Sequence, residues 1–115
     1  MDHTSDPTAA RWPVDPDRLD LVQEFRHRIR GPHSPDLQKL IARLRWGPIA
    51  GRYVVLTLET GRRWMLARQR AERGEKLELF ENHVFTSLED AEWEVFKRRW
   101  EEATGRRLKE DGTAW

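Results

Sequence analysis

Four histidines are the side chains of this chain best suited to bind a metal: His3, His27, His33 and His83. A zinc site on a helix needs two histidines four residues apart, as in HExxH, and no pair here has that spacing. His27 and His33 flank one predicted turn and could approach each other, but no third ligand is evident. We therefore interpret the histidines as exposed or turn-stabilising, and we expect no metal-binding residue on this chain.

Nucleophilic and acid–base chemistry also lacks a recognisable pattern. Ser34 precedes Pro35 and fits a helix cap better than a catalytic serine, and there is no GxSxG elbow. The carboxylates of residues 86–104 alternate with Lys97, Arg98 and Arg99 at the spacing of a solvated helix face. Neither a P-loop nor GxGxxG occurs, and the chain has no cysteine. We expect no catalytic and no cofactor-binding residues on this chain.

Aromatic and basic residues come together between residues 52 and 76. Tyr53 and Trp64, with arginines nearby, are the combination that stacks single-stranded bases. The formal net charge of +1 and the absence of an RNP-like segment argue against nucleic acid. The alternative is that these aromatics belong to the core. We rank nucleic-acid binding below docking on a protein partner, and we keep a small free-standing nucleic-acid-binding or regulatory module as the alternative function.

Two short helices are predicted in the first half of the chain. In residues 17–30 apolar side chains recur at helical spacing, Asp15 can cap the segment, and Gly31-Pro32 stops it. A second helix has Ser34 at its cap and Pro35 at its first position, and it ends before Gly47-Pro48. Its apolar stripe consists of Leu37, Leu40, Ile41 and Leu44. Together the two segments predict a helical hairpin.

The pattern then changes to the period of two that is typical of strands. Residues 52–59 and 62–69 are separated by Thr60-Gly61, which predicts a β-hairpin. In the first strand Val54, Leu56 and Leu58 face one way, and Tyr53, Val55 and Thr57 face the other. Residues 71–76 are predicted to be a loop, and residues 77–85 a third strand.

The last predicted helix follows a cap at Thr86 or Ser87 and ends before Gly105. It carries two apolar stripes, which are Leu88, Ala91 and Val95, and Trp93, Phe96, Trp100 and Ala103. A helix needs only one apolar stripe to cover one face of a small sheet. Because this helix has two, we expect one stripe to face a partner.

These elements predict an α+β fold: an N-terminal helical hairpin, an antiparallel two- to three-stranded sheet and a C-terminal amphipathic helix. We expect an irregular arm over residues 1–16, a single domain over 17–105 and a frayed tail over 106–115. The mean hydropathy of −0.87 is low, but opposite charges nearly cancel, so the chain is expected to fold. No apolar h-region occurs in residues 1–16 and no run is long enough to span a bilayer, so we expect a cytoplasmic protein without membrane contact.

Six tryptophans and an uneven charge distribution favour a protein partner. Core packing is expected for Trp64 and Trp93, while Trp12 and Trp115 fit partner contact and plain exposure equally well. Residues 52–76 carry seven basic and three acidic side chains, whereas residues 77–103 carry eight acidic and three basic ones. Such a bipolar surface suits docking by complementary potentials.

The order of these features resembles a known family. Residues 33–103 are similar to the small (light) subunit of bacterial N,N-dimethylformamidase. The matching segments are His33-Ser34-Pro35-x-Leu37-Gln38, Gly51-Arg52-Tyr53, Trp64 with Arg68, Phe85-Thr86-x-x-Glu89-x-Ala91, and Val95-Phe96-x-Arg98-Arg99. The N-terminal arm is shorter than in that family, and the tail after Gly105 is different.

The resemblance implies an accessory subunit of a hetero-oligomeric amidohydrolase that converts dimethylformamide to dimethylamine and formate. In that family a mononuclear iron, with tyrosine and glutamate ligands, lies on the large catalytic subunit, so no cofactor is implied for this chain. The implied assembly has two small and two large subunits or more. Interface or interface-supporting residues are predicted to be Arg52, Tyr53, Trp64, Arg68 and Trp100. For Tyr53, Trp64 and Trp100 ordinary core packing explains the residue equally well.

Overall fold

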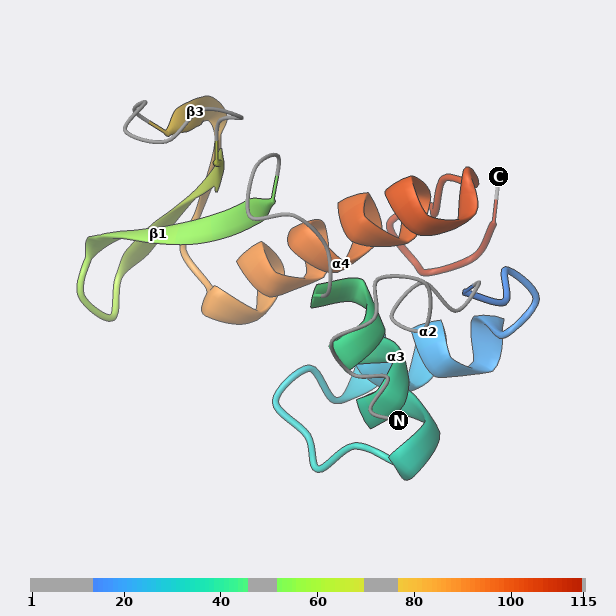
Figure 1. The fold of residues 1–115 in the computed structure, drawn as a ribbon. Coiled ribbons are helices and arrows are strands. Elements are labelled where there is room, and N and C mark those ends of the chain that lie inside the picture. The colour runs from blue at the N-terminus through green and yellow to red at the C-terminus, as the bar shows by residue number, and fades with distance from the viewer. Residues whose placement is uncertain (1–13, 46–51, 70–76, 115) are drawn as a thin grey trace, which may run out of the picture. The chain divides into compact units, whose positions relative to one another are not determined.

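The structure, a computed structural model of the chain, describes residues 14–45, 52–69 and 77–114 (Figure 1). Its elements are α2 (Leu19–His27), α3 (Pro35–Arg45), β1 (Tyr53–Glu59), β2 (Arg63–Arg68), β3 (Glu78–Phe85) and α4 (Leu88–Thr104). The predicted α+β fold is therefore confirmed. The predictions made for residues 1–13, for Gly47-Pro48, for the loop 71–76 and for Trp115 lie outside the described residues.

The described residues form two compact units. One unit comprises α2, α3 and residues 99–114, and the other comprises the three strands and residues 77–98. Helix α4 contributes its first part to the sheet unit and its last turns to the helical unit. The prediction of a single domain over residues 17–105 stays a prediction.

Helix α2 is shorter at both ends than its apolar pattern predicts. Asp15 does not cap it, because its Oδ1 accepts the Asp17 N–H at 2.9 Å and closes a separate turn, so the helix begins at Leu19. The helix ends at His27 because residues 28–31 form another turn, in which the Gly31 N–H donates to the Arg28 carbonyl at 2.9 Å. Its buried side chains are those of Leu21, Val22 and Phe25.

Helix α3 begins as its sequence predicts. The Ser34 hydroxyl accepts the Leu37 N–H at 3.2 Å, and the Ser34 carbonyl accepts the Gln38 N–H at 2.9 Å. Ser34 is therefore the N-cap, and Pro35 occupies the first helical position, where no backbone donor is needed. Helices α2 and α3 pack on each other, as the predicted helical hairpin requires.

The C-terminal tail was expected to be frayed, but residues 106–114 form a hydrogen-bonded turn on α2. Leu108 pairs with Ala114, and its side chain is buried. The Gln23 side chain on α2 donates to the Asp111 carbonyl at 2.9 Å, and Arg26 donates to the Glu110 carbonyl at 3.3 Å. These contacts join residues far apart in sequence, which local sequence patterns do not predict.

The three strands form one antiparallel sheet in the order β1-β2-β3, so the predicted hairpin and the predicted third strand are both confirmed. In β1 and β2, Tyr53 lies opposite Arg68, and Val55 lies opposite Leu66. The register between β2 and β3 shifts sharply: between the pairs Met65–Val84 and Ala67–Leu79, β3 has the four residues 80–83 where β2 has only Leu66. This excess of residues makes β3 bulge locally.

Helix α4 has the predicted cap and the predicted end. The Ser87 hydroxyl accepts the Asp90 N–H at 3.3 Å, and Gly105, at φ 74°, donates its N–H to the Glu101 carbonyl at 2.7 Å. The expectation that one apolar stripe faces a partner is not met, because the aromatic side chains of the second stripe and Val95 of the first are buried within the chain, while Leu88 is half-buried. The buried residues of the two stripes are Ala91, Val95, Trp93, Phe96 and Trp100.

Candidate partner-binding sheet

One face of the sheet, called here the inner face, packs on the first part of α4. Strand alternation places Tyr53 and Val55 on the same face as Leu66. Tyr53, Leu66 and Val95 of α4 form the buried cluster of this unit, with Val55, Phe80 and Phe85 packed against it. The local shift in β3 gives Phe80 its place beside Tyr53, with ring centroids 6.1 Å apart.

The ring of Tyr53 is contacted by two guanidinium groups. The Cζ atom of Arg68 lies 4.7 Å from the ring centroid, and that of Arg98 lies 5.5 Å from it. Arg98 also lies 5.3 Å from the centroid of Phe80. Cation–π contacts of this kind strengthen when the partners are withdrawn from water, and Tyr53 is only 8% exposed.

Arg98 is the polar centre of the inner face. Its Nε donates to Glu94 Oε2 at 2.8 Å, and its Nη2 lies 3.2 Å from His83 Nε2. Because a guanidinium has only donors, the His83 Nε2 accepts this hydrogen bond and the ring proton sits on Nδ1. Burial alone would lower the pKa of Arg98, but hydrogen bonds with Glu94 and Tyr53 outweigh it and raise that pKa. Arg98 thus joins α4 to β1 and β3 and stays charged.

Glu94 completes this network on the helix. Its carboxylate accepts from Arg98 and forms an ion pair with Lys97 at 3.0 Å. Burial works to raise the pKa of the Glu94 carboxyl, yet the hydrogen bonds from Lys97 and Arg98 dominate and lower it. The carboxylate is therefore ionised and already engaged by two cations, which is the state of a structural group rather than of a general acid.

A metal ion does not fit this network. In the described residues, no three histidine, aspartate or glutamate side chains are grouped so that they could hold one. Tyr53 is the sole tyrosine of the sequence, and its ring lies against two cationic groups, which would repel a further cation. What the network does is hold the sheet against α4.

The opposite face of the sheet, called here the outer face, is also apolar. Alternation and register place on it Val54 and Leu56 of β1, Met65 and Ala67 of β2, and Leu79 and Val84 of β3. Leu58 extends the same row on β1, at a break in the register with β2. Three of these side chains are substantially exposed: Leu58 at 41%, Leu79 at 48% and Val84 at 40%. These are the exposed large apolar residues of the described chain.

The five residues predicted to support an interface fall into different surroundings. Tyr53 and Arg68 are in contact on the inner face, and Trp64 is half-buried on the same face, opposite Phe85. Arg52 is half-buried, and its carbonyl accepts the Gln69 N–H at 2.9 Å. Trp100 belongs to the helical unit and is 1% exposed. The burial of Tyr53 and Trp100 agrees with the explanation that these two residues pack in the core.

Sequence reasoning missed the residues that engage Tyr53. Arg98 was assigned to a solvated helix face, His83 was interpreted as exposed or turn-stabilising, and Phe80 was not singled out. The spacing of Glu94 and Arg98 indicated their ion pair, but only the shifted register of β3 brings Phe80 and His83 to the same place. Among the described helices, none combines the length and the apolar character needed to cross a membrane.

Comparison with known protein families identifies a match. A family model described as N,N-dimethylformamidase alpha subunit matches residues 15–110. The matched range contains every helix and strand described above. A comparison with curated proteins found no match.

Proposed function

Since this chain belongs to the N,N-dimethylformamidase alpha subunit family, we propose that it is the small accessory subunit of a hetero-oligomeric amidohydrolase. In this proposal a large catalytic subunit hydrolyses dimethylformamide to dimethylamine and formate, and this chain supports the assembly. The observation that carries the proposal is the family match over residues 15–110, which covers most of the described residues of both compact units. A family of subunits implies a partner chain.

The proposal assigns the iron and its ligands to the large subunit. The Tyr53 environment supports this assignment, because two guanidinium groups lie against its ring and Arg98 hydrogen-bonds with it. The proposed assembly contains two small and two large subunits or more, in the cytoplasm. Within it, Tyr53, Arg68, Arg52 and Trp64 act as interface-supporting residues in the sheet unit, and Trp100 acts as one in the helical unit.

The alternative of a free-standing nucleic-acid-binding module gains no support from the sheet. Base stacking needs an accessible aromatic face. Tyr53 is 8% exposed, and Arg68 and Arg98 already contact its ring, so a base would have to displace groups that the fold uses. Trp64 is half-buried beside Phe85.

Co-expression tests the proposal directly. The large dimethylformamidase subunit of the same organism is produced with and without this chain, and each preparation is assayed for complex mass, iron content and release of dimethylamine. We expect a stable complex, iron bound in proportion to the large subunit, and amidase activity that falls when this chain is omitted. A large subunit that assembles and turns over equally well alone, with this chain remaining unbound, would contradict the proposal.

A further inference from the structure

The sheet carries apolar side chains on both faces, although α4 packs on one of them. An antiparallel sheet with one wet face normally alternates apolar and polar residues along each strand. Here the inner positions Tyr53, Val55 and Leu66 pack against α4, and the outer positions between them are also apolar. The outer row consists of Val54, Leu56, Met65, Ala67, Leu79 and Val84, with Leu58 at the bulge of β1. Such strands are patterned for burial on two sides.

From this pattern we infer that the outer face is the surface by which the chain docks on the large subunit, an inference that rests on the proposed function. Its centre is the row Leu56, Met65 and Val84, flanked by the exposed Leu58 and Leu79. Burying large apolar side chains that are 40–48% exposed provides the driving force for association. The outer face supplies this apolar area, because Trp93, Phe96 and Trp100 of α4 are already buried within the chain.

The charges around the face favour a different chain over a second copy. Alternation and register place Arg63 and Glu59 beside Arg62 at the hairpin end of this face and Arg52 at its other end, so each end carries one net positive charge among the described residues. If two copies stacked these faces about a two-fold axis, a positive end of one sheet would lie against a positive end of the other. This holds whether the strands of the two copies run in the same or in opposite directions. A partner with carboxylates around an apolar patch would not meet this repulsion.

Arg62 indicates where one such carboxylate lies. The neighbouring Arg63 is already paired with Glu59 at 2.9 Å. The exposed Arg62 side chain has no hydrogen-bond or ion-pair partner within residues 14–45, 52–69 and 77–114. The fitting partner surface is therefore apolar, covers the three strands and presents an acidic group opposite the hairpin turn.

A pair of charged substitutions on the outer face tests the inference. Leu79→Glu with Val84→Glu places two carboxylates in the proposed interface, while the control Ala42→Glu adds one carboxylate at an exposed site on α3. Affinity of the full chain for the large subunit is measured by biolayer interferometry, after a thermal melt has shown that each variant folds. We expect the double variant to bind about 30-fold more weakly or worse, since hot-spot losses are of that size, and Ala42→Glu to bind as wild type does.

If the double glutamate variant does not melt cooperatively, Leu79→Ala with Val84→Ala replaces it, with an expected loss of about tenfold. Arg62→Glu is expected to weaken binding mainly at low salt, because it removes a long-range attraction. Unchanged affinity of a folded outer-face variant overturns the inference but leaves the proposed function standing. Failure of the wild-type chain to bind the large subunit overturns both. A third outcome is that the wild-type chain self-associates and that the double variant loses this self-association but still binds the large subunit. In that case a second copy of the chain covers the outer face, and the inference is overturned.

Discussion

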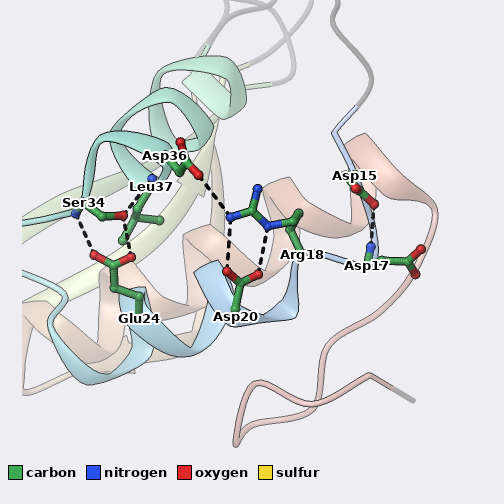
Figure 2. A network of polar contacts seen from close by, with 8 residues as sticks. All are labelled: Asp15, Asp17, Arg18, Asp20, Glu24, Ser34, Asp36 and Leu37. Carbon is green, nitrogen blue, oxygen red and sulfur yellow. Dashed lines mark hydrogen bonds and ion pairs between the residues drawn. The ribbon is translucent and has the colours of Figure 1, made fainter.

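The Glu24 carboxylate on α2 accepts two hydrogen bonds from Ser34, the residue that caps α3 (Figure 2). Both the backbone N–H and the hydroxyl of Ser34 donate, each at 2.7 Å. The hydroxyl oxygen in turn accepts the Leu37 N–H, so one serine connects the side chain of one helix to the first turn of the next. Close by, Arg18 at the start of α2 forms ion pairs with Asp20 of α2 and with Asp36 of α3, and the second pair also joins the two helices.

We predict that Glu24 makes the helical unit more stable at neutral than at acidic pH. The hydrogen bonds from Ser34 lower the pKa of Glu24 below its ordinary value. A carboxyl whose pKa is lowered by folding contributes stability above its unfolded pKa of about 4.3, and loses that contribution as the pH falls through the folded pKa. The melting temperature of Glu24→Gln should therefore be clearly lower than that of the wild type at pH 7, and this difference should shrink towards pH 3.

The matched control for this prediction is Glu81→Gln, which changes an exposed glutamate on β3. Its melting temperature should follow that of the wild type across the same pH range. If the difference in melting temperature between wild type and Glu24→Gln stays constant from pH 7 to pH 3, the carboxylate charge does not stabilise the contact between α2 and α3.

A second prediction separates the two candidate caps of α4. Ser87→Ala removes the hydroxyl that accepts the Asp90 N–H, and it should lower the free energy of unfolding by about 1 kcal/mol. Thr86→Ala changes the preceding, exposed residue and should leave it nearly unchanged. Urea denaturation followed by circular dichroism measures both. Equal losses for the two variants would mean that Ser87 does not act as the cap.

These two sites show how far the sequence predicts the fold. The caps at Ser34 and Ser87, the hairpin around Gly61 and the end of α4 at Gly105 depend on residues a few positions apart, and short patterns specify them. The Glu24–Ser34 contact has a sequence separation of ten residues and requires the packing of α2 on α3. No local pattern distinguishes such a glutamate from a solvated one.

The candidate site is predictable to a similar degree. Alternation along β1 predicts that Tyr53 and Val54 lie on opposite faces of the sheet, and the register confirms it. Which face is covered depends on α4 and on the shifted register of β3, neither of which the strand pattern specifies. For this reason the strand pattern alone does not show that Leu79 and Val84 of the outer face are exposed.

A third prediction concerns the role of Tyr53. Tyr53→Ala removes a buried ring that packs with Leu66 and Val95, and it should cost about 3–5 kcal/mol of stability. Tyr53→Phe keeps the ring and its contacts with Arg68 and Arg98, and it should cost about 1 kcal/mol for the lost hydroxyl. Affinity for the large subunit should be retained in Tyr53→Phe. A folded Tyr53→Phe variant that no longer binds would instead assign the hydroxyl to the interface.

The fourth prediction concerns Gly112 in the C-terminal turn. Gly112 has φ 87°, and a Cβ there would lie 2.6 Å from Gln23 Nε2 and 3.4 Å from Val22 Cγ1. Gly112→Ala therefore combines backbone strain of about 1–2 kcal/mol with displacement of the Gln23 side chain from the Asp111 carbonyl.

Gly61→Ala is the matched control for Gly112→Ala. Gly61 has a similar φ of 74°, but nothing lies within 4 Å of its added Cβ, so this variant measures the backbone strain alone. Chemical denaturation should show a larger loss for Gly112→Ala, by about 1 kcal/mol for the disturbed hydrogen bond. Hydrogen exchange should also show faster exchange of the amides of residues 109–113 in that variant. Equal losses with unchanged exchange would mean that the turn does not depend on its contact with α2.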